Sequence, residues 1–172
     1  AKRMGDWDDE IQAKQDAHWD DDVKAMEQAI CSEGIHSHIT EVYSPPRVTS
    51  MAQKLGLIPG MALDLTTIDA DDGRPWDFND ERKRKKAKKL VRTQRCLLLI
   101  VSPMCTAFSQ LQNMNFARMK EEDVKRVKEY GLKHLEFCME LCRARAEQGL
   151  YFLHEHPAGA SSWKEECVQK VL

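Results

Sequence analysis

The sequence lacks the long apolar run that a membrane span requires, and its charged first residues do not have the pattern of a secretory signal peptide. It also lacks an internal repeat, and its one biased segment is a short basic run. No two cysteines have the Cys-x-x-Cys spacing, and no histidine is spaced with cysteines as in a zinc site. These absences argue against a membrane protein, a repeat protein and a zinc-stabilised fold.

A disulfide framework is not indicated by the six cysteines of the chain. Cys96, Cys138 and Cys142 fall at apolar positions of expected strands and helices, where a free cysteine behaves as a small hydrophobic residue. Because disulfides persist mainly in oxidising compartments, this placement favours a reducing one. We therefore expect an intracellular protein, located in the nucleus or the cytoplasm.

The composition is that of a folded globular protein. Of the 172 residues, 42% are hydrophobic and 31% are charged, and this length suits one domain with a sizeable core. The net charge of −2 conceals an asymmetry, since residues 6–22 contain eight carboxylates and residues 82–95 contain nine basic side chains. The sequence begins and stops abruptly, so we expect a piece of a longer chain or a protein with a partner.

Apolar patterning predicts alternating strands and helices. Strands are expected at residues 35–43, 60–65, 96–101 and 150–153, and helices at 6–33, 47–57, 80–93, 121–147 and from 162 to the end. A polar loop is expected at 66–79. This alternation is typical of a parallel α/β sheet with right-handed crossovers. We therefore predict a Rossmann-like α/β domain over residues 35–172, preceded by an acidic helical segment at 1–34.

Two short segments carry the candidate chemistry. Residues 102–109, Ser-Pro-Met-Cys-Thr-Ala-Phe-Ser, follow one apolar run, and residues 153–157, Leu-His-Glu-His-Pro, complete another. In open α/β sheets ligands bind beyond the carboxyl ends of the strands. A thiol, that of Cys105, and a carboxylate, that of Glu155, are therefore expected to meet at one rim of the sheet.

This Pro-x-Cys-x-x-Phe-Ser element, followed by a glutamate after the next strand, resembles motifs IV and VI of the catalytic domain of DNA cytosine-5 methyltransferases. Pro103, Cys105, Phe108 and Ser109 match the first motif, and Glu155 matches the second. The resemblance implies that Cys105 adds to carbon 6 of cytosine and that Glu155 acts as an acid beside ring nitrogen 3. It also implies methyl transfer from S-adenosylmethionine to DNA. The family's later motifs would lie beyond residue 172, so the implied methyltransferase-type sheet is truncated.

The same resemblance places a cofactor site over the first strands. In the family an acidic residue at the end of the second strand binds the donor's ribose, and a later aspartate approaches its adenine. These positions correspond to Asp64 and Asp77. Arg47 would pair with the donor's carboxylate tail. The full set of implied cofactor residues is Glu41, Ser44, Arg47, Asp64, Asp77 and Pro103.

The first turn departs from the family's pattern. Residues 43–49, Tyr-Ser-Pro-Pro-Arg-Val-Thr, replace the family's Phe-x-Gly-x-Gly element, and no glycine occurs between Gly34 and Gly56. Glycine lets the backbone approach a ligand closely, and proline removes an amide donor. Donor binding through backbone amides is therefore not expected at this turn.

A second resemblance concerns the context of the domain. Residues 41–49, 64–67 and 154–157 are similar to segments of a domain found in large retroelement polyproteins of marine protists. Those polyproteins also carry reverse transcriptase. The resemblance implies that the chain belongs to a polyprotein of this type.

Each candidate nucleic-acid-binding residue could also have an ordinary structural role. Lys85, Lys86, Lys88 and Lys89 could hold phosphates, or they could form an ordinary solvated helix face. Ser109 could bind phosphate or cap the following helix. The alternative function for the whole chain is a catalytically inactive scaffold or nucleic-acid-binding module that keeps the fold.

The candidate catalytic residues have plainer interpretations too. Taken alone, Cys105 would more simply be a buried structural cysteine. His154 and His156 flank Glu155 and suggest a metal site. However, strand alternation sends both histidines to the same side, away from the glutamate, and we predict no metal.

Overall fold

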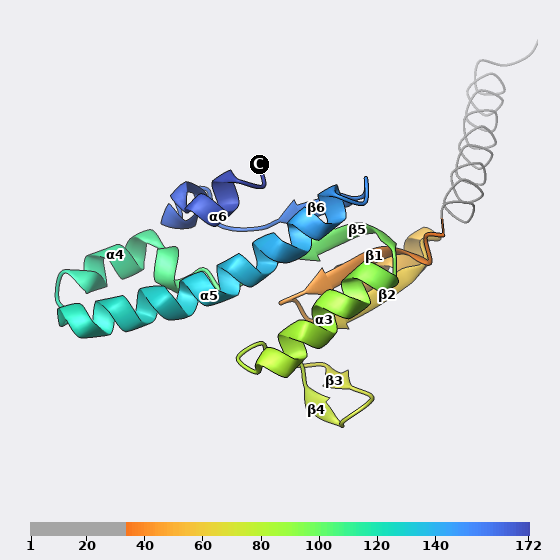
Figure 1. The fold of residues 1–172 in the computed structure, drawn as a ribbon, viewed down its shortest axis with the longest axis horizontal. Helices are drawn as coiled ribbons and strands as arrows, with labels where there is room; N and C mark the ends of the chain where they lie inside the picture. Colours follow the sequence, from red (N-terminus) through yellow and green to blue (C-terminus); the bar gives the residue numbers. More distant parts are fainter. Residues whose placement is uncertain (1–33) are drawn as a thin grey trace, which may run out of the picture. The chain divides into compact units, whose positions relative to one another are not determined.

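Four parallel strands form the central sheet, in the spatial order β2-β1-β5-β6 (Figure 1). Their bounds are Ser37–Val42 for β1, Pro59–Leu63 for β2, Cys96–Val101 for β5 and Tyr151–His154 for β6. The computed structural model describes residues 34–172, so the acidic helix expected at 6–33 lies outside the described residues. The expected α/β class and parallel sheet are confirmed, and they are consistent with a Rossmann-like fold.

Helices connect the strands of the sheet, and a short one follows the last strand. They are α2 (Val48–Ala52), α3 (Glu81–Thr93), α4 (Gln110–Phe116), α5 (Glu121–Ala146) and α6 (Glu166–Gln169), with 3₁₀ turns η1 (Gln53–Leu55), η2 (Thr106–Phe108) and η3 (Ser161–Lys164). None of the helices within residues 34–172 is both long and apolar enough to cross a membrane.

The chain reverses its direction across the sheet at β1. From β1 it moves outward to β2, and it then returns to the other side of β1 to form β5 and β6. In the strand register, Val42 pairs with Val101 and Val101 pairs with His154, so β1, β5 and β6 end level with one another. The carboxyl ends of β1 and β5 therefore form a topological switch point, where open α/β sheets bind their ligands.

Different helices pack against the two faces of the sheet. Val42, Leu99 and Val101 belong to the hydrophobic core that also contains residues of α3 and α5. Glu41 points to the opposite face, where Thr49 of α2 donates to its carboxylate. Thus α2 covers this second face over β1 and β2, as right-handed crossovers in opposite directions require.

One face of the edge strand β6 is open. Tyr151 and Leu153 are 67% and 47% exposed, and they pair in register with Leu98 and Ile100 of β5, which are only partly buried. Alternation along the strand sends Phe152 to the opposite face, where it packs against the core. The apolar surface on the open face is therefore continuous across β5 and β6.

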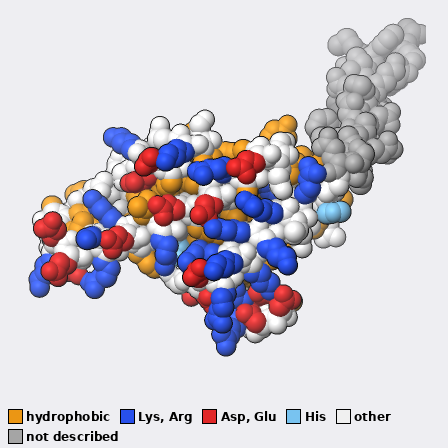
Figure 2. All heavy atoms as spheres, in the orientation of Figure 1, with side chains coloured by type: hydrophobic (Ala, Val, Ile, Leu, Met, Phe, Trp, Pro, Cys, Tyr) orange, Lys and Arg blue, Asp and Glu red, His pale blue; other side chains and the backbone are white. Residues whose placement is uncertain are grey.

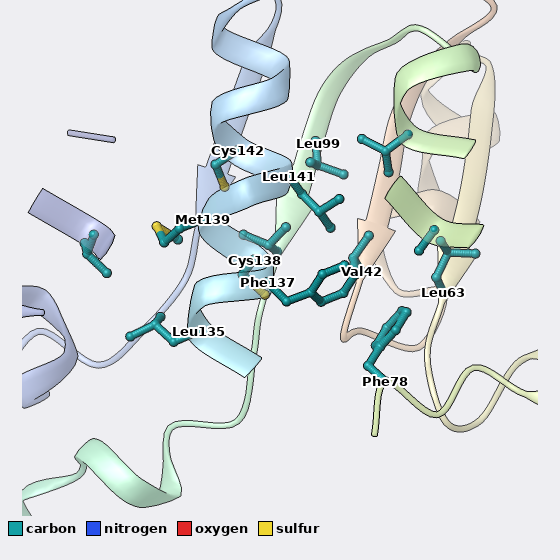
Figure 3. Close-up of a cluster of buried hydrophobic side chains, with 14 of the residues drawn as sticks. Val42, Leu63, Phe78, Leu99, Leu135, Phe137, Cys138, Met139, Leu141 and Cys142 are labelled. Atoms are coloured by element: carbon teal, nitrogen blue, oxygen red, sulfur yellow. The ribbon is translucent and has the colours of Figure 1, made fainter. Parts of the chain in front are cut away.

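The helix α5 supplies more buried residues to the core than any other element. Figure 3 shows Phe137 and Leu141 on the side of α5 toward the strands and α3, and Leu135 and Met139 on the side toward the C-terminal segment. All four side chains are at least 98% buried, and burial of each contributes about 2 kcal/mol. The helix thus joins the sheet to the last turns of the chain.

A short hairpin lies within the segment expected to be a polar loop. Its strands are β3 (Ile68–Asp69) and β4 (Arg74–Pro75). Lys83 of α3 donates to Asp69 and to Asp72, at 2.7 Å each, and its ammonium group lies 5.0 Å from the centre of the Trp76 ring. These contacts attach the hairpin to α3.

The segment expected to form one helix from residue 162 to the end forms two short helical pieces instead. After η3 the backbone becomes extended at Glu165 (φ −67°, ψ 138°), and only the short helix α6 follows. Side-chain contacts hold this break, because Trp163 Nε1 donates to the Pro157 carbonyl at 2.8 Å and Gln169 Nε2 donates to the Trp163 carbonyl at 2.7 Å. Tertiary contacts override the local helical pattern here.

Candidate functional site

A cavity of about 210 Å³ lies at the switch point, beside the residues that follow β1, β2 and β5. Its walls carry four aromatic rings and two carboxylates, those of Tyr43, Trp76, Phe78, Tyr130, Asp64 and Asp77. No lysine or arginine is among its lining residues. A ligand in this cavity meets negative charge and aromatic faces, which favours a cation over a phosphate.

Local hydrogen bonds fix both carboxylates of the cavity. Asp64 directly follows β2, and its Oδ1 accepts from the amide and the hydroxyl of Thr66 at 2.9 and 2.8 Å. Asp77 Oδ1 accepts in the same way from the amide and side-chain amide of Asn79, at 2.9 and 3.0 Å. Within residues 34–172 neither Oδ2 has a hydrogen-bond partner, so each carboxylate keeps one oxygen for a ligand.

A hydrogen-bonded network lines one side of the cavity. Tyr43 Oη lies 2.6 Å from His134 Nδ1, and His134 Nε2 lies 3.2 Å from Asn79 Oδ1. Asn79 directs its Nδ2 to Asp77 and Tyr130, so its Oδ1 is the acceptor. His134 Nε2 therefore carries the hydrogen, and Nδ1 accepts from the Tyr43 hydroxyl. Burial lowers the pKa of His134 to about 4, which keeps the ring neutral at neutral pH.

Sequence reasoning missed this network. Tyr43 and His134 are 91 residues apart, and the periodic pattern of α5 treats a buried histidine as one more core position. The one available signal was the position of Tyr43 as the last residue of an expected strand. In the structure Tyr43 has a φ of 61°, which is the left-handed region that favours glycine.

The three candidate cofactor residues of the first turn lie outside the cavity wall. Glu41 is 1% exposed, and its carboxylate accepts from Ser44 Oγ at 2.9 Å and from the amide and hydroxyl of Thr49 at 2.7 Å. Burial raises the pKa of Glu41, but these hydrogen bonds bring it below its ordinary value. Glu41 thus closes the turn between β1 and α2, and Arg47 is exposed at the start of α2.

Cys105 lies on the loop after β5 and directly precedes η2. Its side chain is half-buried, as is that of Met104, while Pro103 before them is buried. Met104 lines the cavity, and Cys105 does not. The buried free cysteines in the described part of the chain are those on β5 and α5, namely Cys96, Cys138 and Cys142.

Glu155 extends the pairing of β5 and β6 by one residue. Its amide donates to the Val101 carbonyl at 3.0 Å, and its side chain is exposed. The rings of His154 and His156 are 4.8 Å apart, so the two histidines share one side of the strand end, as expected from alternation. Cys105 and Glu155 therefore follow the ends of neighbouring strands, while the cavity itself brings together Asp64 and Asp77.

Ion pairs occupy most of the candidate phosphate-binding lysines. The pairs are Lys85 with Glu81, Lys86 with Asp69 and Asp71, and Lys88 with Glu140. Lys89 is exposed and has no ion pair within residues 34–172. Figure 2 shows basic and acidic side chains interspersed over α3 and the adjoining hairpin. Carboxylates of the hairpin and of α5 therefore interrupt the basic surface of α3.

Of the two roles considered for Ser109, the structure shows the helix cap, because its Oγ accepts from the amide of Gln112 at 3.1 Å. No group of three or more histidine, cysteine, aspartate or glutamate side chains within residues 34–172 is arranged to hold a metal ion.

No protein-family model, curated protein or solved structure matches the chain. Functional inference therefore depends on the geometry of the site.

Proposed function

We propose that this domain binds S-adenosylmethionine in the switch-point cavity and is a methyltransferase of the cytosine-5 type. The observation that carries the proposal is the composition of the cavity wall, in which Asp64, Asp77 and four aromatic rings occur without a lysine or arginine. S-adenosylmethionine is a nucleoside with a sulfonium and an ammonium group and no phosphate. Carboxylates and aromatic faces suit such a cation, whereas a dinucleotide would bring phosphates to a wall without positive charge.

The cavity residues suit the parts of this nucleoside. A carboxylate after the second strand accepts ribose hydroxyls in dinucleotide-binding folds, and Asp64 has that position with Oδ2 unpaired in the described structure. Trp76 and Phe78 offer apolar faces for a base beside Asp77. The cavity of about 210 Å³ is smaller than the roughly 300–1,000 Å³ of typical ligand sites, so it suits the nucleoside portion alone.

Recognition in this chain depends on side chains. The turn after β1 is closed on Glu41, which already uses the amide of Thr49. Pro45 and Pro46 provide no amide hydrogen. The backbone donors that hold phosphates in glycine-rich turns are therefore missing at this turn, which again favours a ligand without phosphate.

Cys105 suits the role of nucleophile because it is half-buried on a loop, whereas cysteines buried in an apolar core are inert. When bound, S-adenosylmethionine supplies an electrophilic methyl group. In the proposed reaction the Cys105 thiol would lose its proton and its sulfur would bond to carbon 6 of cytosine. The electron pair of the 5,6 double bond would take up the methyl group at carbon 5, and S-adenosylhomocysteine would be left. Glu155 would hold a proton at ring nitrogen 3. Loss of the carbon-5 proton to a base then expels the thiolate and restores the double bond.

Calorimetric titration of the 172-residue chain tests the proposal. We expect S-adenosylmethionine to bind and ATP not to bind. Asp64→Asn should weaken binding at least tenfold, equivalent to about 1.4 kcal/mol, because it removes a charged acceptor from the cavity. Glu122→Gln, which changes an exposed carboxylate outside the cavity, should leave the affinity unchanged. Binding of ATP in place of S-adenosylmethionine would refute the proposal.

Binding and methyl-transfer measurements together distinguish an active enzyme from the catalytically inactive alternative. The turn after β1 favours the inactive alternative, because it is closed on Glu41. Cys105→Ser should retain binding of S-adenosylmethionine and lose methyl transfer to a cytosine-containing DNA duplex. Binding by the wild-type chain without any methyl transfer would instead support a non-catalytic binding module.

A further inference from the structure

His156 contacts the loop that carries Cys105 on both sides of the cysteine. It is 7% exposed, and its Nε2 lies 3.0 Å from the carbonyl of Pro103, two residues before Cys105. Its ring centre lies 6.2 Å from that of Phe108, three residues after Cys105. One side chain at the end of β6 therefore restrains the whole loop.

The partners of His156 determine where its hydrogen is. A carbonyl oxygen only accepts, so Nε2 carries the hydrogen donated to Pro103. Nδ1 then accepts from the hydroxyl of Ser162, which is fully buried and 2.6 Å away. Burial lowers the pKa of His156, although the Pro103 contact and the charge of Glu155 act in the opposite direction. The neutral ring thus has one defined tautomer.

The residues beside Ser162 add to this restraint. Ser161 Oγ donates to the Phe108 carbonyl at 3.4 Å. The Trp163 ring packs edge-on against His156, with 6.5 Å between the ring centres. The loop after β5 is therefore held by the segment after β6, which is the neighbouring strand of the sheet.

We infer that His156 is a positioning residue for Cys105, and that its hydrogen bond to the Pro103 carbonyl holds the cysteine loop against the end of β6. The role of Cys105 as nucleophile rests on the proposed function. The restraint itself is independent of any methyl donor, because it consists of contacts within the chain. Loss of the hydrogen bond shifts the loop toward conformations in which the thiol is more accessible.

The rate of Cys105 alkylation by iodoacetamide, measured on the full chain by mass spectrometry of the Cys105 peptide, tests the inference. His156→Leu fills the site without a hydrogen bond and should speed alkylation about fivefold. His156→Gln keeps an Nε hydrogen that can reach the carbonyl and should restore a rate within about twofold of wild type. Cys167, half-buried on α6, serves as an internal control with an unchanged rate.

Equal rates for the wild-type chain and His156→Leu would overturn the inference. Equal acceleration in the Leu and Gln variants would do the same, because side-chain shape rather than the hydrogen bond would then matter. Should His156→Leu fail to fold, Ser162→Ala removes only the hydroxyl that orients the ring, and an unchanged Cys105 rate in that variant would also overturn it. Accelerated alkylation without binding of S-adenosylmethionine would refute the cofactor proposal and leave this inference standing.

Discussion

Tyr43 holds a strained backbone conformation at the end of β1. Its φ of 61° costs a non-glycine residue roughly 1 kcal/mol. Side-chain contacts offset this cost, since the hydroxyl bonds to His134 and the ring centre lies 4.7 Å from that of Phe78. Backbone strain of this kind is concentrated at functional sites. The position of Tyr43 on the cavity wall thus agrees with a binding role for the cavity.

The buried ion pair between Lys83 and Asp69 makes the stability of the domain depend on pH. Burial alone would raise the pKa of Asp69, but hydrogen bonds from Lys83 and Lys86 lower it from 3.8 to about 2. A carboxyl with a lowered pKa stabilises the fold above its unfolded value and loses that contribution as the pH falls through the folded value. We expect the free energy of unfolding, measured with urea, to decrease between about pH 4 and pH 2.

Asp69→Asn should remove this part of the pH dependence and lower stability at neutral pH by about 3 kcal/mol, because the buried Lys83 loses its buried carboxylate partner and keeps only the half-exposed Asp72. Glu122→Gln serves as the control, since its carboxylate is exposed. Parallel pH profiles for Asp69→Asn and the wild-type chain would contradict this assignment.

The residues of the cavity differ in how well the sequence predicts them. Asp64 could be predicted to lie at the rim, because the carboxyl ends of parallel strands share one edge of a sheet. The hydrogen bonds that Ser44 and Thr49 donate to the Glu41 carboxylate were not predicted. The position of these two hydroxyl residues close to Glu41 in the sequence was a usable signal. His134 could not be placed, since its position depends on how α5 packs across the sheet.

The elements α5 and η2 approach each other closely at Gly131. A Cβ atom at this position would lie 2.4 Å from the Cβ of Ala107 and 3.2 Å from the Phe108 ring. Glycine within a helix costs about 1 kcal/mol relative to alanine, so a steric reason for its presence is needed. The reason is that η2, which begins directly after Cys105, packs against α5 at this point.

Gly131→Ala should therefore lower the free energy of unfolding by about 1–3 kcal/mol, although alanine is the better helix former. The clash involves two Cβ atoms, and relieving it requires a backbone shift of η2. Lys125→Ala, on an exposed position of the same helix, should change stability by less than about 0.5 kcal/mol. Denaturant unfolding measures both variants, and a stabilised Gly131→Ala protein would show that η2 moves without cost.

Elements set by local patterning were predicted well. The strand β5 has the predicted bounds, because a short continuous apolar run between polar residues favours a strand. The helix α5 ends within one residue of its predicted end. The β3–β4 hairpin was missed, because its stability comes from ion pairs with α3 rather than from its own sequence pattern.

Across the whole sheet, the order β2-β1-β5-β6 leaves β6 at an edge with one open apolar face. Parallel sheets are ordinarily covered on both faces, and exposed edges and apolar patches promote association. The alternation of strands and helices predicted the parallel sheet, but it did not predict which strand lies at the edge. That outcome depends on pairings between strands distant in the sequence.

Replacing Tyr151 by Thr and Leu153 by Lys should reduce self-association, measured by light scattering at increasing protein concentration. Both side chains are exposed, so each change should alter the free energy of unfolding by less than about 0.5 kcal/mol. Leu111→Lys, which changes an exposed leucine on α4, is the matched control. Scattering that falls equally in the control and in the β6 variant would show that the open face has no special part in association.

The central place of β1 also determines the order in which the sheet forms. Its pairing with β2 closes only the short connection through α2, whereas its pairing with β5 must enclose β2, the hairpin and α3 as well. The entropy lost on loop closure grows with loop length, and non-local pairing is slow. We therefore expect the β1–α2–β2 unit to assemble before β5 docks, and the switch-point cavity to be completed only at that later step.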